Sequence, residues 1–217
     1  MCNDFGVLWD MDGVLVDTAE FHYRSWEKVL AEMGVPFDRN RFVTVFGRNN
    51  TDTLAGILGR KPDAQLSQQI SQRKEALFRQ LIRGHIEALP GVRLWLERLQ
   101  SLGVRQVVAS SAPQENIDFL MDELGLRPYF VALCASHSLP GKPDPTLFLQ
   151  AAGILELPPE RCIVIEDSLA GVEAARRAGM KCIAVATTNP LEALGGADLA
   201  VERLDRLSLD AFEKLIG

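Results

Sequence analysis

The apolar and polar positions of the chain follow two patterns, short apolar runs and longer stretches in which apolar residues recur at helical spacing. A short apolar run is typical of a strand that is buried on both faces of a sheet. Such runs cover residues 5–9, 105–109, 129–135, 161–165, 181–186 and 197–201. Helical spacing covers residues 89–103, 116–124, 145–153, 169–178 and 209–215. This alternation predicts an α/β fold, a doubly wound parallel sheet with helices on both faces.

One long segment lacks strand-like runs. Between Thr18 and Gly84 the apolar residues keep helical spacing throughout, which predicts an all-helical region. We expect its helices over residues 19–33, 42–46, 51–58 and 64–83. Asn50 or Thr51 is expected to cap the third of these helices. The chain should therefore form two domains: an α/β core of residues 1–17 and 85–217, and an inserted helical domain of residues 18–84.

The first apolar run ends at a pair of carboxylates. Asp10 and Asp12 follow residues 5–9, and Gly13 allows the backbone to turn there. Open α/β sheets bind ligands at the carboxyl edge of their strands, where both side chains would lie. Two close carboxylates repel each other unless a cation lies between them, and Mg²⁺ prefers oxygen ligands. Aspartate and glycine also favour turns, so this stretch alone does not separate a metal site from a turn.

Polar side chains follow later strands in the same way. They are Ser110 and Ser111 after residues 105–109, Lys142 in the loop after residues 129–135, and Glu166 and Asp167 after residues 161–165. Each has a simpler explanation: Ser110 could cap a helix, Lys142 could be a surface lysine, and acidic residues suit a helix start. The carboxyl ends of parallel strands meet at one edge, however. Together these groups can bind a metal ion and a phosphate.

Composition narrows the class of protein. Apolar residues make up 47% of the chain and charged residues 24%, as in soluble globular proteins. The formal net charge of −6, with scattered basic residues, argues against nucleic acid as a partner. No apolar stretch reaches the length of a membrane span, and the start of the chain lacks the pattern of a signal peptide. We expect no membrane partner, and a monomer or weak dimer.

The cysteines indicate the compartment. They are Cys2, Cys134, Cys162 and Cys182. The last three lie in strand-like runs, and none forms a CxxC pair, so buried free thiols are expected rather than disulfides or a zinc site. Free thiols fit a reducing environment, and we expect a cytoplasmic protein.

The strand-end motifs resemble those of the haloacid dehalogenase superfamily, whose phosphohydrolases and phosphomutases use an aspartate nucleophile. The matching stretches are Asp10-Met11-Asp12-Gly13-Val14-Leu15 with Asp17-Thr18, then Ser110, then Lys142, and then the run from Glu166 to Met180. The resemblance covers nearly the whole chain. The helical insertion resembles the cap domain of the subgroup that contains beta-phosphoglucomutase and small sugar phosphatases.

The resemblance implies a role for each strand-end group. Asp10 would be the nucleophile that forms an aspartyl-phosphate, and Asp12 the general acid and base. Lys142 would balance the carboxylates and contact the phosphoryl group, whose oxygens Ser110 and Ser111 would help to bind. Mg²⁺ would be held by Asp10, the backbone carbonyl of Asp12, Glu166 and Asp167.

Residues of the cap are expected to select the substrate. The resemblance implies substrate contacts for Thr18, His22, Arg48 and Asn50, beside those of Ser110, Ser111 and Lys142. The chain departs from the mutase pattern, because Phe46 replaces a cap lysine and Asn50 replaces a cap arginine, although Arg48 is close in sequence and could substitute for that arginine. Residues 112–114 also lack the lysine that binds the distal phosphate in the mutase. Fewer cations weaken the binding of a second phosphate, which a mutase needs and a phosphatase does not.

These features favour a magnesium-dependent phosphatase that hydrolyses a small phosphorylated metabolite, a sugar phosphate in particular. Beta-phosphoglucomutase activity is the alternative. A non-catalytic phosphate-binding scaffold is a second alternative, although a degenerate member would be expected to lose Asp10, Asp12 or Lys142, and all of them are present.

Overall fold

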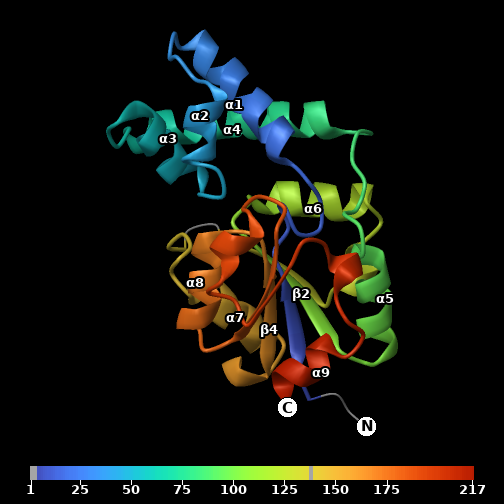
Figure 1. Ribbon diagram of the computed structural model, residues 1–217. Coiled ribbons are helices and arrows are strands. Elements are labelled where there is room, and N and C mark those ends of the chain that lie inside the picture. Colours follow the sequence, from blue (N-terminus) through green and yellow to red (C-terminus); the bar gives the residue numbers. More distant parts are fainter. Residues whose placement is uncertain (1–3, 137–138) are drawn as a thin grey trace. The chain divides into compact units, whose positions relative to one another are not determined.

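The computed structural model describes residues 4–136 and 139–217 (Figure 1). The chain forms two compact units, one of Met1–Asp17 with Glu87–Gly217 and the other of Thr18–Ile86. Cys2 lies outside the described residues. Among the described cysteines, Cys162 and Cys182 are buried free thiols, whereas the free thiol of Cys134 is only half-buried. In the described part of the chain, no helix is both long enough and apolar enough to span a membrane.

The first unit is built on a six-stranded sheet in which every neighbouring pair of strands is parallel. Its strands are β1 (Gly6–Trp9), β2 (Arg105–Ser110), β3 (Ala132–Ala135), β4 (Cys162–Glu166), β5 (Lys181–Val185) and β6 (Leu199–Val201). The predicted α/β class is therefore confirmed. The strand order is β3-β2-β1-β4-β5-β6, so the chain runs outward from β1 and then crosses back to β4. Open α/β sheets bind ligands where the strand order reverses in this way, which here is at the carboxyl ends of β1 and β4.

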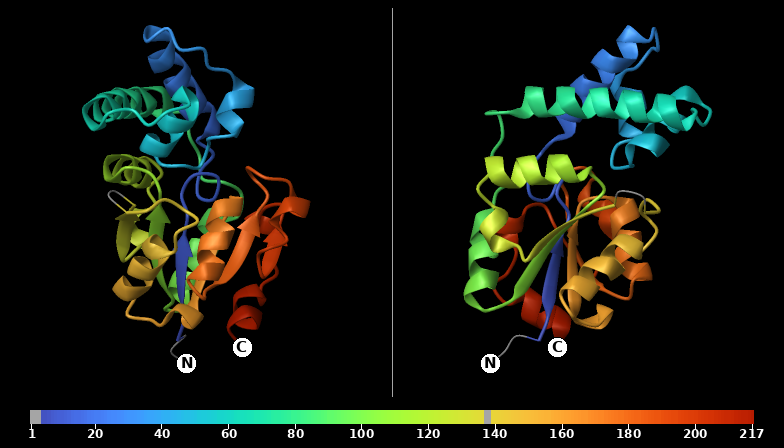
Figure 2. Two further views of the ribbon diagram at one scale, coloured as in Figure 1. Left: turned by 90° about the vertical axis from the view of Figure 1, so that its left-hand side faces the viewer. Right: turned by 180° about the vertical axis from the view of Figure 1, so that it is seen from behind.

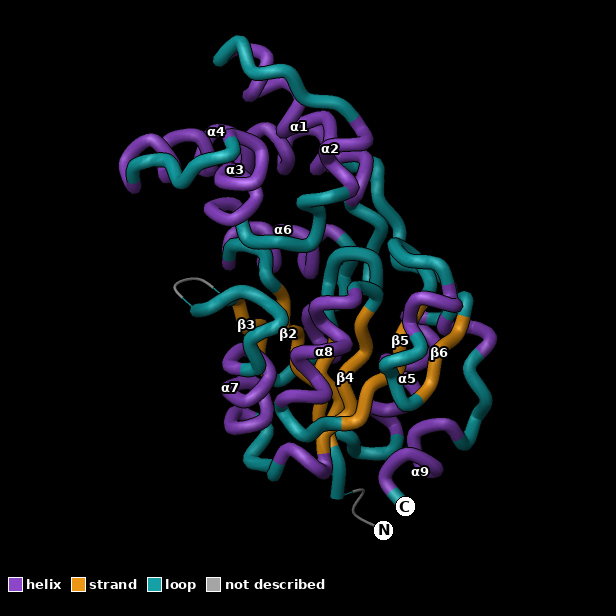
Figure 3. The backbone as a smooth tube through the Cα atoms, turned by 60° about the vertical axis from the view of Figure 1, so that its left-hand side comes forward, coloured by secondary structure: helices purple, strands orange, loops and turns teal. Residues whose placement is uncertain are grey.

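Helices cover both faces of this sheet (Figure 2). The helices of the first unit are α5 (Val92–Ser101), α6 (Gln114–Glu123), α7 (Thr146–Ile154), α8 (Leu169–Arg177) and α9 (Ala211–Ile216). Helices α7 and α8 lie alongside the strands of the sheet (Figure 3). Their side chains, such as Phe148 and Val172, pack in one buried cluster with Leu8 and Val164 of the strands. Successive strand residues point to opposite faces. Strands covered on both faces must be apolar throughout, which is why they appear in the sequence as continuous runs.

The second unit is helical. It contains α1 (Ala19–Glu32), α2 (Arg39–Val43), α3 (Asn50–Leu58) and α4 (Ala64–Ile82). Its own core gathers apolar side chains from these helices, including Trp26, Leu30, Leu54, Ile57 and Ile70. Because this core belongs to the unit itself, residues 18–86 can pack without strands of their own.

Two details of the helical unit differ from the sequence-based expectation. The cap of α3 is Asn49, whose side chain accepts a 2.9 Å hydrogen bond from the Asp52 N–H, so the expected cap at Asn50 or Thr51 is wrong. The helix expected over residues 42–46 instead begins at Arg39, because Asp38 accepts from the Arg41 N–H at 2.8 Å. Both caps place an acceptor at an otherwise unsatisfied backbone donor.

One strand is shorter than its apolar run. The run over residues 129–135 predicts a strand throughout, but Arg127–Tyr129 form a 3-10 helix and β3 begins only at Ala132. Pro128 explains the early helical turn, since its ring fixes φ and its nitrogen has no hydrogen to donate to a ladder.

Candidate active site

Asp10 lies where the central strand ends. Its backbone N–H donates to the carbonyl of Ile165 at 3.0 Å, which ties the end of β1 to the end of β4. The register pairs Trp9 with Ile165, so the next residues along each strand, Asp10 and Glu166, lie side by side. Asp10 is 6% exposed and Glu166 only 1%. The sheet register therefore forces two carboxylates from distant parts of the sequence into one buried place.

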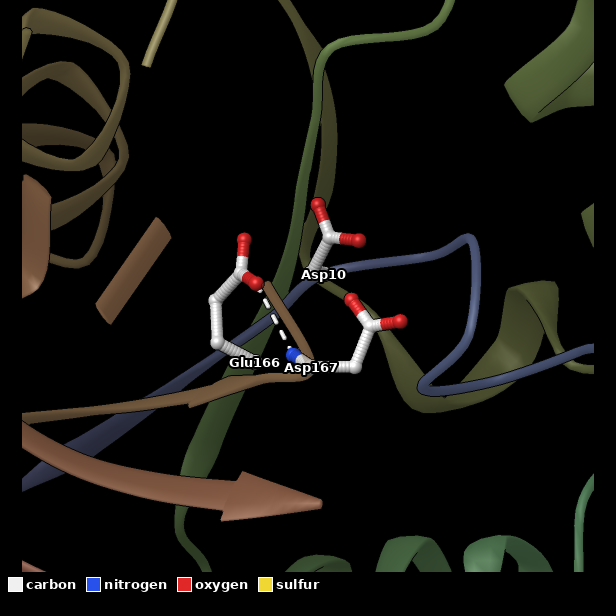
Figure 4. Close-up of side chains that lie close together, drawn as sticks. All are labelled: Asp10, Glu166 and Asp167. Atoms are coloured by element: carbon white, nitrogen blue, oxygen red, sulfur yellow. Dashed lines mark hydrogen bonds between the residues drawn. The ribbon is translucent and has the colours of Figure 1, made fainter. Parts of the chain in front are cut away.

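Asp167 completes a cluster of three carboxylates. Figure 4 shows the side chains of Asp10, Glu166 and Asp167 gathered at the ends of their strands, and each offers an oxygen within 4.8 Å of the others. Among residues 4–136 and 139–217, this is the group of acidic, histidine or cysteine side chains that has the geometry to hold a metal ion. Carboxylate oxygens are the ligands that Mg²⁺ takes in proteins.

Glu166 is held by several donors. One of its oxygens accepts from the backbone N–H groups of Asp167 and Ser168, both at 2.8 Å, and from the Ser168 hydroxyl at 2.9 Å. The same hydroxyl accepts from the Gly171 N–H at 3.0 Å and so caps α8. A side chain at position 171 would overlap the Glu166 carboxylate, so glycine is required there. Ser168, rather than either acidic residue, is thus the residue that starts α8.

Lys142 supplies the positive charge of the site. Its ammonium contacts Asp10 Oδ1 at 2.6 Å and also donates to Glu166 Oε1. The lysine side chain is 5% exposed and lies 5.0 Å from the centre of the Phe148 ring. The alternative of an ordinary surface lysine is therefore wrong. The loop between β3 and α7 carries Lys142 to the same carboxyl edge that holds the acidic residues.

The electrostatic balance of the cluster is unfavourable without a further cation. Burial raises the pKa of Asp10 to about 7; Lys142 opposes this shift, while the charges of Glu166 and Asp12 add to it. Burial raises the pKa of Asp167 well above its usual range, and the charges of Glu166 and Asp10 add to this shift. Burial disfavours the charge of Lys142, but pairing with two carboxylates outweighs burial and raises its pKa. Three carboxylates and one ammonium leave two negative charges, which a divalent cation would balance.

The other residues expected at this edge lie close by with different surroundings. Asp12 is half-buried in the loop after β1, where its backbone bridges to Val16. Its carboxylate is not among the three that converge, but its charge acts on Asp10. Ser110 ends β2 and is buried, and its hydroxyl accepts from the Ala112 N–H at 3.1 Å. Its role as a helix cap is excluded, because α6 begins after Pro113. Ser111 follows it and is half-buried.

The helical unit holds a second polar cluster. The Lys74 ammonium lies 2.6 Å from His22 Nδ1 and 2.8 Å from Glu75 Oε1, and Asn50 donates to that glutamate oxygen at 2.7 Å. The His22 ring stacks on Phe78 with centroids 4.1 Å apart. Burial works against the charge of Glu75, but Lys74 and His22 outweigh it and lower its pKa to about 2. The cluster thus contains a compensated ion pair.

This cluster includes two of the residues expected to contact substrate. His22 and Asn50 are joined through Lys74 and Glu75, whereas Arg48 is exposed. Thr18 is buried at the start of α1, and its carbonyl accepts from the His22 N–H at 3.0 Å.

The sequence did not lead us to predict Lys74 and Glu75 as site residues, although the position of Lys74 among apolar residues could have indicated a buried charge. Lys74 lies four residues after Ile70 and four before Phe78, so it is a charged residue on the apolar face of α4. Thr188 was also missed. It follows β5 in the manner of the other strand-end groups, and its hydroxyl donates to Asp167 Oδ2.

Comparison with known protein families matches residues 6–179 to the haloacid dehalogenase-like hydrolases. The match covers most of the chain, and the chain therefore belongs to this family. The family membership that the motifs imply is thus confirmed, and with it the hydrolase class.

Named relatives are similar over nearly the full chain. A chloroplastic 5-amino-6-(5-phospho-D-ribitylamino)uracil phosphatase of Arabidopsis thaliana is 32% identical over 99% of the chain, which spans 58% of that protein. A beta-phosphoglucomutase of Bacillus subtilis is 32% identical over 94% of the chain and 92% of its own length. The crystal structure of a beta-phosphoglucomutase of Clostridium difficile superposes with a TM-score of 0.87 at 26% identity, covering 97% of this chain and 96% of that one.

The raised pKa of Asp10 predicts how stability depends on pH. The folded protein binds a proton at Asp10 up to about pH 7, whereas the unfolded chain releases it near 3.8, so stability falls as pH rises between these values. In chelator-treated protein we expect Asp10→Asn to melt at a higher temperature than wild type at pH 8, with a gap that narrows toward pH 4. Asp63→Asn, at an exposed helix cap, serves as the control. Equal melting temperatures at pH 8 would contradict the electrostatic argument.

The buried pair in the helical unit predicts a second stability effect. Lys74→Met leaves Glu75 buried and ionised without its main partner, which destabilises by about 3 kcal/mol. We expect the double variant Lys74→Met with Glu75→Gln to recover part of this loss, as measured by urea denaturation. Arg73→Met is a matched control, because Arg73 pairs with Glu32 at the surface and should change stability by less than about 1 kcal/mol. If the losses of stability caused by Lys74→Met and by Glu75→Gln simply add up in the double variant, Lys74 and Glu75 are not energetically coupled.

Proposed function

We propose that the protein is a magnesium-dependent phosphatase that hydrolyses a small phosphorylated metabolite, a sugar phosphate in particular, through an aspartyl-phosphate. The observation that carries this proposal is the convergence of Asp10, Lys142, Glu166 and Asp167 at one buried edge of the sheet. The family is a hydrolase family, and the named Arabidopsis relative is a phosphatase. A scaffold without catalysis would have no need to bury a carboxylate against its own electrostatic repulsion.

In this mechanism the chain divides hydrolysis into two displacements. Asp10 attacks the phosphorus atom of the ester; a bond forms between its oxygen and phosphorus while the bond to the leaving oxygen breaks. Asp12 gives a proton to that leaving oxygen. Asp12 then takes a proton from the water that attacks the aspartyl-phosphate, and the products are inorganic phosphate and the free Asp10 carboxylate.

The remaining residues of the site bind and orient the phosphoryl group. Lys142 holds one oxygen of Asp10 in place and faces the incoming phosphoryl oxygens, which Ser110 and Ser111 also contact. The Asp10, Glu166 and Asp167 carboxylates with the Asp12 backbone carbonyl are the groups that would hold Mg²⁺. When bound, the ion would neutralise charge that develops on the phosphoryl oxygens.

We assign residues 18–84 to a cap domain that selects the substrate, and residues 1–17 with 85–217 to the catalytic core. Thr18, His22, Arg48 and Asn50 are the proposed cap contacts. Lys74 joins this set, because it binds both His22 and the Glu75 that holds Asn50.

The charge of the cap cluster favours a phosphatase over a mutase. Glu75 is ionised and cancels the charge of Lys74, so the pair offers no net positive charge to a second phosphate. Neutral hydroxyl groups of a sugar or polyol suit such a hydrogen-bonding cluster better. Beta-phosphoglucomutase activity is the second candidate, and it is supported by the Bacillus subtilis relative.

The first experiment measures phosphate release from p-nitrophenyl phosphate and from a panel of phosphorylated sugars and polyols. We expect turnover with Mg²⁺, its loss on addition of EDTA and its return when Mg²⁺ is restored in excess. Asp10→Asn should lower kcat by at least about a thousand-fold, because the nucleophile is absent. Full activity of either the chelated enzyme or Asp10→Asn would reject the mechanism.

A second experiment separates the two candidate reactions. The enzyme is given beta-glucose 1-phosphate together with beta-glucose 1,6-bisphosphate as primer, and glucose 6-phosphate and inorganic phosphate are both measured. We expect phosphate to accumulate and little glucose 6-phosphate to form. Rapid formation of glucose 6-phosphate without phosphate release would instead establish the mutase.

A further inference from the structure

The loop that follows β5 touches both the side chain and the backbone of Asp167. The Thr188 hydroxyl donates to Asp167 Oδ2, and Asn189 Nδ2 donates to the Asp167 carbonyl at 3.0 Å. The two loops are neighbours because β4 pairs with β5, with Glu166 in register with Ala184. Residues more than 20 positions apart in sequence are therefore tied at the point where a metal ligand is needed.

A third segment packs against the same carboxylate. Gly13 has a φ of +80°, and a side chain at this position would overlap Asp167 Oδ2 and approach Thr188 Oγ1 to 3.0 Å. The backbone of the loop after β1 thus packs directly against the Asp167 carboxylate at Gly13, and Thr188 donates a hydrogen bond to the same carboxylate. Asp167 is 4% exposed, so solvent contributes little to fixing its orientation.

Whether the donor to a metal-ligating carboxylate is charged or neutral affects metal binding. Lys142 binds Asp10 and Glu166 with a full positive charge, which competes with any cation for those oxygens. Thr188 is a neutral donor that can fix the position of one oxygen and leave the negative charge of Asp167 in place. Donors of this kind orient metal-ligating carboxylates in proteins, and their loss weakens metal binding by about 10- to 100-fold.

We propose that Thr188 is a positioning residue, whose hydroxyl holds the Asp167 carboxylate in the orientation that a bound Mg²⁺ requires. This inference rests on the proposed function, in which Asp167 is a metal ligand. Thr188 itself touches neither the metal nor the phosphoryl group. Its effect passes through Asp167.

The chain offers a matched control beside it. Thr187 is also an exposed threonine of this loop, and its backbone N–H donates to the Val185 carbonyl at 2.9 Å. Replacing Thr187 by valine keeps that backbone bond and removes a hydroxyl of the same kind. A difference between Thr187→Val and Thr188→Val therefore reports the contact with Asp167 and not a general effect on the loop.

The test is direct titration of chelator-treated protein with MgCl₂ by isothermal calorimetry, with no substrate present. We expect Thr188→Val to bind Mg²⁺ about 10-fold more weakly or worse, Thr188→Ser to bind within about three-fold of wild type, and Thr187→Val to match wild type. Melting temperatures of the metal-free variants show whether each one is folded. If Thr188→Val does not fold, Thr188→Ala removes the hydroxyl with a smaller side chain and takes its place.

An Asp167→Asn variant in the same titration distinguishes failure of the positioning role of Thr188 from failure of the proposed metal site. If it loses Mg²⁺ binding while folded Thr188→Val binds with the wild-type Kd, the positioning role is overturned and the metal site stands. If Asp167→Asn binds Mg²⁺ as wild type does, the proposed metal site falls, and the role of Thr188 falls with it. Equal weakening in Thr187→Val and Thr188→Val would also overturn the inference, because the contact with Asp167 would not be its cause.

Discussion

Repulsion among three buried carboxylates is the constraint on which the site of the first unit depends. Asp10, Glu166 and Asp167 are nearly inaccessible to water, and a single ammonium, that of Lys142, balances them in part. Charges in such a place are tolerated only when fixed donors and counter-charges replace the lost water. The surrounding structure supplies fixed donors, including backbone N–H groups and a serine hydroxyl on Glu166. The charge that remains suits a divalent cation and a phosphoryl group, so the unfavourable balance and the proposed chemistry have one origin.

The fold brings these groups together through the order of its strands. Strands are added on one side of β1 as far as β3 and then on its other side from β4, so the ends of β1 and β4 are neighbours although their residues are far apart in sequence. Close packing then requires two glycines: Gly13 lets the backbone lie against Asp167, and Gly171 leaves room for the Glu166 carboxylate. Gly13, which lets the backbone turn after the first strand, is therefore also needed to make room for Asp167, about 150 positions later in the chain.

The helical unit also buries charged groups, but there each buried charge has a partner of opposite sign. Lys74 and Glu75 are buried as an adjacent ion pair. His22 contacts Lys74, and Asn50 donates a hydrogen bond to Glu75. Here the charges cancel, whereas the acidic cluster of the sheet keeps an excess of negative charge. A phosphatase for hydroxyl-rich phosphate esters would use a hydrogen-bonding cluster around a compensated ion pair for selection, and an acidic cluster that can hold a cation for chemistry.

Sequence by itself was sufficient for the α/β class, for the helical character of the segment between β1 and α5, and for the strand-end positions of Asp10 and Glu166, because periodicity and strand ends are local properties of the chain. It also indicated Asp167 and, by resemblance, Lys142. Tertiary structure alone decided that Lys142 is buried between two carboxylates, that Thr188 reaches Asp167, and that Lys74 and Glu75 form a buried pair. These contacts join segments through strand order, loop path and helix packing, and no local pattern specifies which distant side chain fills the space beside a buried charge.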